Sequence, residues 1–205
     1  MRQSHGLWES SSIDAPDTHP TEGDLRRWME RLSAGDTAAL ERLFQAMYAP
    51  LCAFAQTIVR SASEAEDVVG ETFLKLWTLR DRIRVRGSVR NYLYTAVRNT
   101  SVNHLGRARR EARYVETNPL DLEDTRAQVV DDVEDRLYTE ELTARVKQAI
   151  ELLPRRAQQT YILYYQHEMS YAEIARVMGV SIKTVENQLA RALRILWSRL
   201  EDVIQ

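Results

Sequence analysis

The chain has 205 residues, of which 44% are hydrophobic and 28% charged, a composition that fits one ordinary domain or two small ones and excludes a disordered protein. Its apolar runs are far shorter than the roughly 20 residues that a membrane helix needs, and its N-terminus has no secretory signal pattern, so we expect a cytoplasmic protein without a membrane span. A single cysteine, Cys52, excludes an intrachain disulfide, and the four scattered histidines lack metal-ligand spacing, so we expect no metal site and no cofactor.

The formal net charge of −2 hides a strong segregation of charge along the chain. Residues 80–113 hold ten basic and two acidic residues, whereas residues 114–141 hold two basic and ten acidic ones. A basic block beside an acidic one is typical of a nucleic-acid surface followed by a solvated linker.

The first quarter of the chain changes from an irregular to a helical pattern. Residues 1–22 mix Ser, Asp, Pro, Thr and His with little periodicity, so we interpret them as a disordered leader. Apolar residues at helical spacing then predict two helices that are divided at Gly35-Asp36. Pro50 is expected to restart the chain into a further helical segment.

Two more helices are predicted before residue 114. Ser61-x-x-Glu64 is a capping-box pattern, and it opens a segment that runs through Trp77. An interruption at Gly87-Ser88 precedes a long basic helix, residues 89–113. The core side of this helix is assigned to four apolar residues, Leu93, Ala96, Val97 and Val102.

The second half of the chain begins with a predicted linker. Residues 114–132 are acidic and weakly periodic, so we expect them to be flexible and to separate a first domain, residues 23–113, from a second, residues 133–205. Because no segment alternates at the strand period, the predicted fold class is all-α, with two small helical domains.

The second domain is predicted to contain four helices. Pro154 is well placed in the first turn of the second of them. A second capping box, Ser170-x-x-Glu173, opens a short helix that ends at Gly179, and Ser181 caps the last helix.

Residues 170–189 have the pattern of a helix-turn-helix. Ala175 is small where two helices cross, Gly179 supplies the turn, and apolar spacing locks the helices together through Ile174, Val180, Val185 and Leu189. The free face of the second helix then presents donors and acceptors suited to a DNA major groove. Its residues are Lys183, Thr184, Glu186, Asn187, Gln188 and Arg191. The alternative is an ordinary helical hairpin.

The basic segment between residues 82 and 113 is the second candidate site. Its arginines are interleaved with tyrosines and amides, so one surface supplies phosphate neutralisation, base stacking and base-edge hydrogen bonds. A solvated basic face over a helical core is the alternative. The candidate DNA-binding residues are Arg84, Arg86, Arg90, Asn91, Tyr92, Arg98, Asn99, Asn103 and Arg107.

An acidic stripe lies earlier in the chain. Asp67, Glu71 and Lys75 recur at helical spacing on one side of the predicted helix, opposite Val69, Phe73 and Leu76. By composition alone such a stripe is more often a solvated face than an interface.

Three motifs in order carry a family resemblance. They are Asp67-Val68-Val69-x-Glu71-Thr72-Phe73-Leu74-Lys75-Leu76-Trp77, then Asn91-Tyr92-Leu93-Tyr94-Thr95-Ala96-Val97-Arg98-Asn99, then the helix-turn-helix. Over about residues 23–205 the chain resembles the extracytoplasmic-function (ECF) sigma factors of the sigma-70 family, and the short acidic linker fits that group. The resemblance implies a non-enzymatic subunit that binds core RNA polymerase and directs promoter-specific transcription initiation.

The resemblance also implies a role for each candidate surface. The last helix would read the −35 element and its domain would touch the polymerase flap. The loop from about residue 83 to 90 and the helix after it would recognise the −10 element, capture an unpaired base and aid melting. An anti-sigma factor is a further implied partner. The clamp helices of the largest polymerase subunit would bind a surface formed by Asp67, Val68, Glu71, Leu74 and Lys75.

Two other function classes are weighed against this one. A helix-turn-helix regulator that binds duplex DNA without core polymerase is the alternative, and charge reversal at Asp67 and Glu71 separates it from a sigma factor. An enzyme is not expected, because the sequence contains no Gly-rich phosphate loop, nucleophile–base pair or metal cluster.

Overall fold

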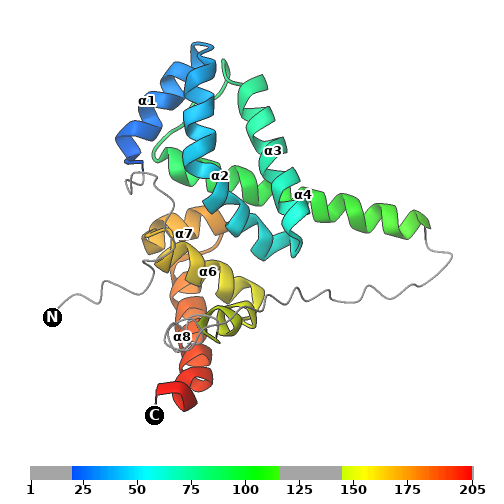
Figure 1. Ribbon diagram of the computed structural model, residues 1–205, viewed down its shortest axis with the longest axis vertical. Coiled ribbons are helices and arrows are strands. Elements are labelled where there is room, and N and C mark those ends of the chain that lie inside the picture. The colour runs from blue at the N-terminus through cyan, green and yellow to red at the C-terminus, as the bar shows by residue number, and fades with distance from the viewer. Residues whose placement is uncertain (1–19, 116–144, 205) are drawn as a thin grey trace, which may run out of the picture.

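The computed structural model describes residues 20–115 and 145–204, and every regular element in these ranges is a helix (Figure 1). The first range contains α1 (Glu22–Ser33), α2 (Thr37–Val59), α3 (Ala62–Thr78) and α4 (Val89–Val115). The second contains a helical stretch at residues 145–151, then α6 (Arg155–Tyr165), α7 (Tyr171–Met178) and α8 (Ile182–Ile204). The all-α fold is confirmed. The predicted linker, residues 114–132, lies outside the described residues apart from the end of α4.

Side-chain caps begin the helices where the sequence patterns predict them. Ser61 Oγ accepts a hydrogen bond from the Glu64 amide at 3.3 Å, at the start of α3. At the start of α7 the box is reciprocal, because Ser170 caps the Glu173 amide while the Ser170 amide donates to the Glu173 carboxylate at 2.9 Å. Gly179 ends α7 with a φ of 65°, a left-handed conformation that glycine adopts without steric penalty.

Pro50 lies inside α2 and does not divide it, so the predicted restart at this residue is wrong. A proline in a helix interior removes one hydrogen bond and costs about 3 kcal/mol or more. The helix continues through the proline because Met47, Leu51 and Phe54, on either side of it, are buried in the core. Core packing outweighs the local preference here.

Three residues of the predicted leader, residues 1–22, lie within the described part of the chain. Residues 1–19 lie outside the described residues, but Pro20, Thr21 and Glu22 belong to the fold. Thr21 caps α1 in a reciprocal pair with Asp24, in which each backbone amide donates to the other side chain at 3.2 Å. This box uses aspartate in place of the more usual glutamate or glutamine, so it does not match the usual sequence pattern of a capping box.

One large core joins helices from both described ranges. In Figure 1, α6 and α7 accordingly lie beside α2 and α4. Phe54, Val69 and Leu93 in α2–α4 are buried in the same cluster as Leu163 of α6 and Ile174 of α7. Within it α7 packs on α4, and α6 packs on α2. A smaller cluster between the 145–151 stretch, α6 and α8 completes the C-terminal half. The sequence did not predict the packing of α7 on α4.

The buried face of α4 differs in part from the predicted one. Leu93 and Val97 are fully buried as predicted, and Ala96 is half-buried. Val102 is 49% exposed, so its assignment to the core is wrong. The buried face passes instead through the neighbouring Thr100 and Ser101. None of the described helices combines the length and apolar character that a membrane crossing requires.

Candidate nucleic-acid interface

The helix-turn-helix geometry follows from three local features. The Glu173 capping box begins α7, Gly179 turns the chain, and Ser181 Oγ accepts a hydrogen bond from the Thr184 amide at 3.1 Å at the start of α8. Buried apolar residues hold the two helices together: Val185 is fully buried, as is Ile174 on α7. One face of α8 is consequently directed away from the core.

This face carries the six residues predicted to contact a major groove. Lys183, Asn187 and Arg191 are exposed, whereas Thr184, Glu186 and Gln188 are half-buried. Lys183 Nζ lies 2.9 Å from Glu186 Oε2, so the Glu186 carboxylate is already engaged within the helix. Asn187 and Arg191 make no side-chain hydrogen bond to other described residues. Their donors are therefore available to an outside partner.

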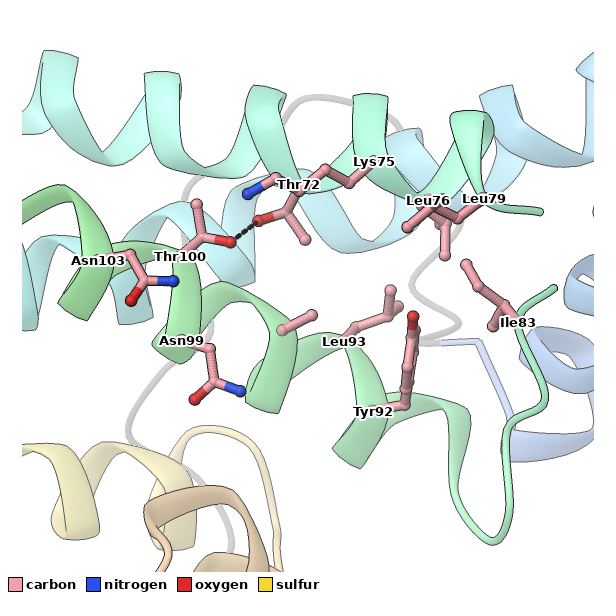
Figure 2. A pocket seen from close by; sticks show the side chains of 11 residues that line it. Thr72, Lys75, Leu76, Leu79, Ile83, Tyr92, Leu93, Asn99, Thr100 and Asn103 are labelled. Carbon is pink, nitrogen blue, oxygen red and sulfur yellow. Dashed lines mark hydrogen bonds between the residues drawn. The ribbon is translucent and has the colours of Figure 1, made fainter.

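A pocket of about 240 Å³ lies between α3, the loop at residues 79–88 and α4 (Figure 2). Tyr92 stands at the loop end of the pocket, and Asn99 and Asn103 follow along α4 (Figure 2). The Thr72 hydroxyl pairs with Thr100 at 3.3 Å and ties α3 to α4 beside it. Apolar walls are supplied by Leu76, Leu79, Ile83 and Leu93. The pocket therefore combines an aromatic ring, an apolar floor and amides at its edge.

The predicted DNA-binding residues on α4 are partly accessible. Asn99, Asn103 and Arg107 are exposed, and Tyr92 and Arg98 are half-buried. Burial raises the pKa of the Tyr92 hydroxyl, which keeps the ring neutral. Asn99, Asn103 and Arg107 recur at helical spacing along α4, so they lie on the same side of the helix, beginning at the pocket.

The arginines near the loop are held differently from one another. Arg84 Nη1 donates to the carbonyl oxygens of Asp81 at 2.8 Å and of Ile83 at 3.0 Å. Arg90 Nη2 donates to the Pro20 carbonyl at 3.0 Å. Arg86 is exposed, and its side chain makes no hydrogen bond or ion pair with the described residues. Of these predicted residues, Arg86 is the most available to a phosphate.

Asn91 does not have the accessibility that a DNA contact requires. Its side chain is only 7% exposed, and its Nδ2 donates to Glu173 Oε1 of α7 at 3.2 Å. The neighbouring Tyr94 is fully buried and lies against His167, with ring centroids 4.9 Å apart. The predicted contact of Asn91 with DNA is therefore excluded in this arrangement, because α7 covers it.

Within the acidic stripe on α3, Glu71 forms ion pairs with two neighbouring cations. Asp67 is exposed, whereas Glu71 pairs with Lys75 at 2.5 Å and with Arg107 of α4 at 3.2 Å. The Lys75 ammonium, followed by the Arg107 guanidinium, holds the pKa of the Glu71 carboxyl below its usual value. Val68 is fully buried, so the prediction that it contacts polymerase directly is wrong. Its side chain belongs to the hydrophobic core instead.

An apolar groove beside this stripe was not predicted. Leu74 is 65% exposed, and Phe44 of α2, at 38%, packs on Phe73 with ring centroids 5.0 Å apart. With Leu40 and Trp77 they line a hollow of about 390 Å³ between α2 and α3. The sequence does contain one signal for this groove. Leu74 is an apolar residue that does not belong to the predicted core side of this helix, which is formed by Val69, Phe73 and Leu76. The groove and the acidic stripe together form one mixed surface.

Two family descriptions match the chain. "Sigma-70 region 2" matches residues 43–111, and "Sigma-70, region 4" matches residues 143–196. The first match contains the pocket, the acidic stripe and most of the groove, and the second contains the helix-turn-helix.

Curated relatives and solved structures agree with these matches. The RNA polymerase sigma-H factor of Pseudomonas aeruginosa is 25% identical over 90% of this chain and 98% of its own. The ECF RNA polymerase sigma-E factor of Escherichia coli K12 is 25% identical over 86% of this chain and 94% of its own. The structure of CnrH in complex with the cytosolic domain of CnrY has a TM-score of 0.60 at 23% identity, covering 87% and 98% of the two chains. The sigma factor RpoE with the anti-sigma factor NepR from Bartonella quintana has a TM-score of 0.58 at 22% identity, covering 78% and 95%. These structures share its fold.

Proposed function

The chain belongs to the sigma-70 family, in the extracytoplasmic-function group, as a sigma factor that directs promoter-specific transcription by RNA polymerase, and we propose how its surfaces divide this work. Members of this family are not enzymes. We infer that the chain performs no chemistry itself and contributes binding to an opened promoter in the cytoplasm. The observation that carries the proposal is that one chain combines a pocketed basic helix, a mixed acidic and apolar surface and a helix-turn-helix.

The two domains of the chain are assigned to different promoter elements. Residues 23–113 bind polymerase and the −10 element, residues 133–205 bind the −35 element, and residues 114–132 link them. Holding both on one polymerase raises the effective concentration of each for its element and makes the distance between the elements part of the specificity.

The −35 element is read by the exposed face of α8. Asn187 and Arg191 are the leading residues, because they are exposed and have no hydrogen-bond partner among the described side chains. An amide or a guanidinium that forms two hydrogen bonds to a base edge discriminates against the wrong base by about 1–3 kcal/mol. Lys183 lies at the first turn, where its charge suits a phosphate.

The −10 element is captured at the pocket between α3 and α4. An unstacked base is recognised by an aromatic ring, apolar walls and hydrogen bonds to its edges, and Tyr92, Asn99 and Asn103 supply these groups. Arg86 and Arg107 are exposed on either side, where phosphate contacts compensate the cost of melting. Binding to promoter DNA should therefore weaken steeply with salt.

Core polymerase docks on the mixed surface of α2 and α3. Exposed Asp67 and the Glu71–Lys75 pair give the surface its charge pattern, and Leu74 with the groove beside it gives apolar area to bury. Such a combination, an apolar centre with a charged rim, is typical of a protein interface. We assign the clamp helices of the largest subunit to this surface and the flap to the C-terminal domain.

An anti-sigma factor is proposed as a second partner. The two solved structures named above are complexes with a further protein, CnrY in one and the anti-sigma factor NepR in the other. The same groove on α2 and α3 offers such a partner apolar contact.

The test is co-elution with bacterial core RNA polymerase on gel filtration. Wild type is expected to bind stoichiometrically, and the double variant Asp67→Lys, Glu71→Lys is expected to elute alone. Asp67→Lys is the cleaner single change, because Asp67 makes no ion pair among the described residues, whereas Glu71 also holds Arg107. A wild type that elutes free of polymerase and still binds duplex DNA would instead support an independent regulator, which the match of region 2 does not favour.

A further inference from the structure

The first turn of α4 is capped by a residue from α1. Glu22 accepts hydrogen bonds from the Val89 amide, from the Arg90 amide at 3.4 Å and from the Ser88 hydroxyl at 2.9 Å. Ser88 Oγ in turn accepts one from the Asn91 amide at 3.2 Å. A carboxylate at a helix N-terminus satisfies amides that have no partner within the helix and complements the positive end of the helix dipole. Glu22 therefore completes this turn from 67 residues away in sequence.

Two further hydrogen bonds join the same parts of the chain. Arg26 Nη2 donates to the Gly87 carbonyl at 2.9 Å, where Gly87 turns the loop with a φ of 94°. Arg90 Nη2 donates to the Pro20 carbonyl at 3.0 Å. The loop at residues 79–88 is flanked by α3 and α4. Among the described residues, the hydrogen bonds that join this loop to any other helix come from two residues of α1, Glu22 and Arg26.

α1 is itself fixed to the core, so it can act as a rigid support. Leu25 and Leu32 are fully buried and Met29 is 7% exposed. The family description for region 2 begins at residue 43, which leaves α1 outside the part of the chain to which that description applies. The contacts of Glu22 thus connect α1, which lies before the residues that this description matches, to the proposed −10 surface.

We propose that Glu22 is a positioning residue for −10 recognition, which holds the loop and the first turn of α4 in the conformation that presents Arg86 and Tyr92 to DNA. Tyr92 follows the capped turn directly, and Arg86 lies next to the Gly87 turn that Arg26 holds. Without Glu22 the loop and the start of α4 lose their common anchor, and the pocket loses its defined end. This inference rests on the proposed function, because it assigns a residue to the −10 surface.

The experiment is in vitro transcription by core polymerase with each variant, on a template library randomised at both promoter elements. Sequencing of the transcribed templates gives the base preference at −10 and at −35 for the same protein preparation. Glu22→Ala is expected to reduce discrimination at −10 by roughly five- to tenfold, the factor that one N-cap interaction of ordinary strength represents. The preference at −35 is expected to stay unchanged. A merely destabilised protein would lose activity on all templates equally and keep both preferences.

Further variants make the result specific. Glu22→Gln keeps an acceptor oxygen and is expected to fall between wild type and Glu22→Ala. Arg26→Ala removes the Gly87 contact by itself and is expected to act in the same direction. Glu30→Ala is the matched control, since Glu30 is exposed on α1 and its side chain makes no hydrogen bond to the described residues.

Two outcomes overturn different statements. If wild type selects both elements and Glu22→Ala retains the full −10 preference, the positioning role is wrong while the proposed function stands. If wild type with core polymerase shows no selection at either element, the proposed function itself fails.

Discussion

Truncation of Leu74 to alanine should weaken binding to core polymerase without weakening the fold. The side chain is 65% exposed, so an exposed-surface substitution of this kind changes the free energy of unfolding by only about 0.5 kcal/mol. Complete burial of a leucine side chain is worth about 1.5–3 kcal/mol relative to full exposure. Burial of the part still exposed therefore contributes roughly 1–2 kcal/mol of binding free energy, which corresponds to an increase in Kd of about 5- to 30-fold on truncation.

A competition assay measures this change directly. Fluorescently labelled wild type is bound to core polymerase, and unlabelled variants displace it at fixed salt concentration. Val102→Ala is the matched control, because Val102 is an aliphatic residue that is 49% exposed on α4 and lies outside the proposed docking surface, and it should compete as wild type does. Equal competition by Leu74→Ala and wild type would refute the assignment of polymerase docking to this surface.

Three further predictions concern other parts of the molecule. Asn187→Ala should relax the preference at one or two −35 positions by about 1–3 kcal/mol in a binding-site selection, with an unchanged melting temperature because the side chain is exposed. The pKa of Glu71 lies below its usual 4.5, chiefly through its hydrogen bond to Lys75. Ionised Glu71 therefore stabilises the fold at pH values above 4.5, and this stabilisation is lost as the pH falls through the lowered pKa. Acid unfolding followed by circular dichroism should accordingly be less steep for Glu71→Gln than for wild type below pH 4.5. Asn91→Leu should leave the free energy of unfolding unchanged or raise it by up to about 1 kcal/mol, since it removes a half-satisfied buried amide; a loss above about 2 kcal/mol in urea unfolding would contradict this.

Features encoded by neighbouring residues could be predicted from the sequence. The caps at Ser61, Ser170 and Ser181 and the turn at Gly179 each depend on side chains within a few residues of the helix end. The buried and exposed faces of α8 follow from the helical period for the same reason. These local features were sufficient to predict the all-α fold and the helix-turn-helix.

Features that depend on distant residues could not be predicted in this way. Pro50 remains helical because the residues on either side of it are buried in the core. The local sequence pattern does not show that core. Glu22 was assigned to a leader, although its partners lie at residues 88–90. Val68 was assigned to the polymerase-binding surface by the family resemblance, whereas its side chain is buried in the core between the helices. Long-range contacts thus decide the details of both candidate surfaces.

The environment of Asn91 relates the packing of α7 on α4 to promoter recognition. Its amide group donates to Glu173, but its carbonyl oxygen is buried without a hydrogen-bond partner among the described residues. A buried polar group that lacks a partner costs about 1–3 kcal/mol, which offsets the roughly 0.5–1.5 kcal/mol gained from one hydrogen bond. This polar contact therefore fixes how α7 sits on α4 more than it stabilises the contact. Because α7 covers Asn91, that residue reaches DNA only after α7 has left α4, so this packing and the reading of a base by Asn91 exclude each other.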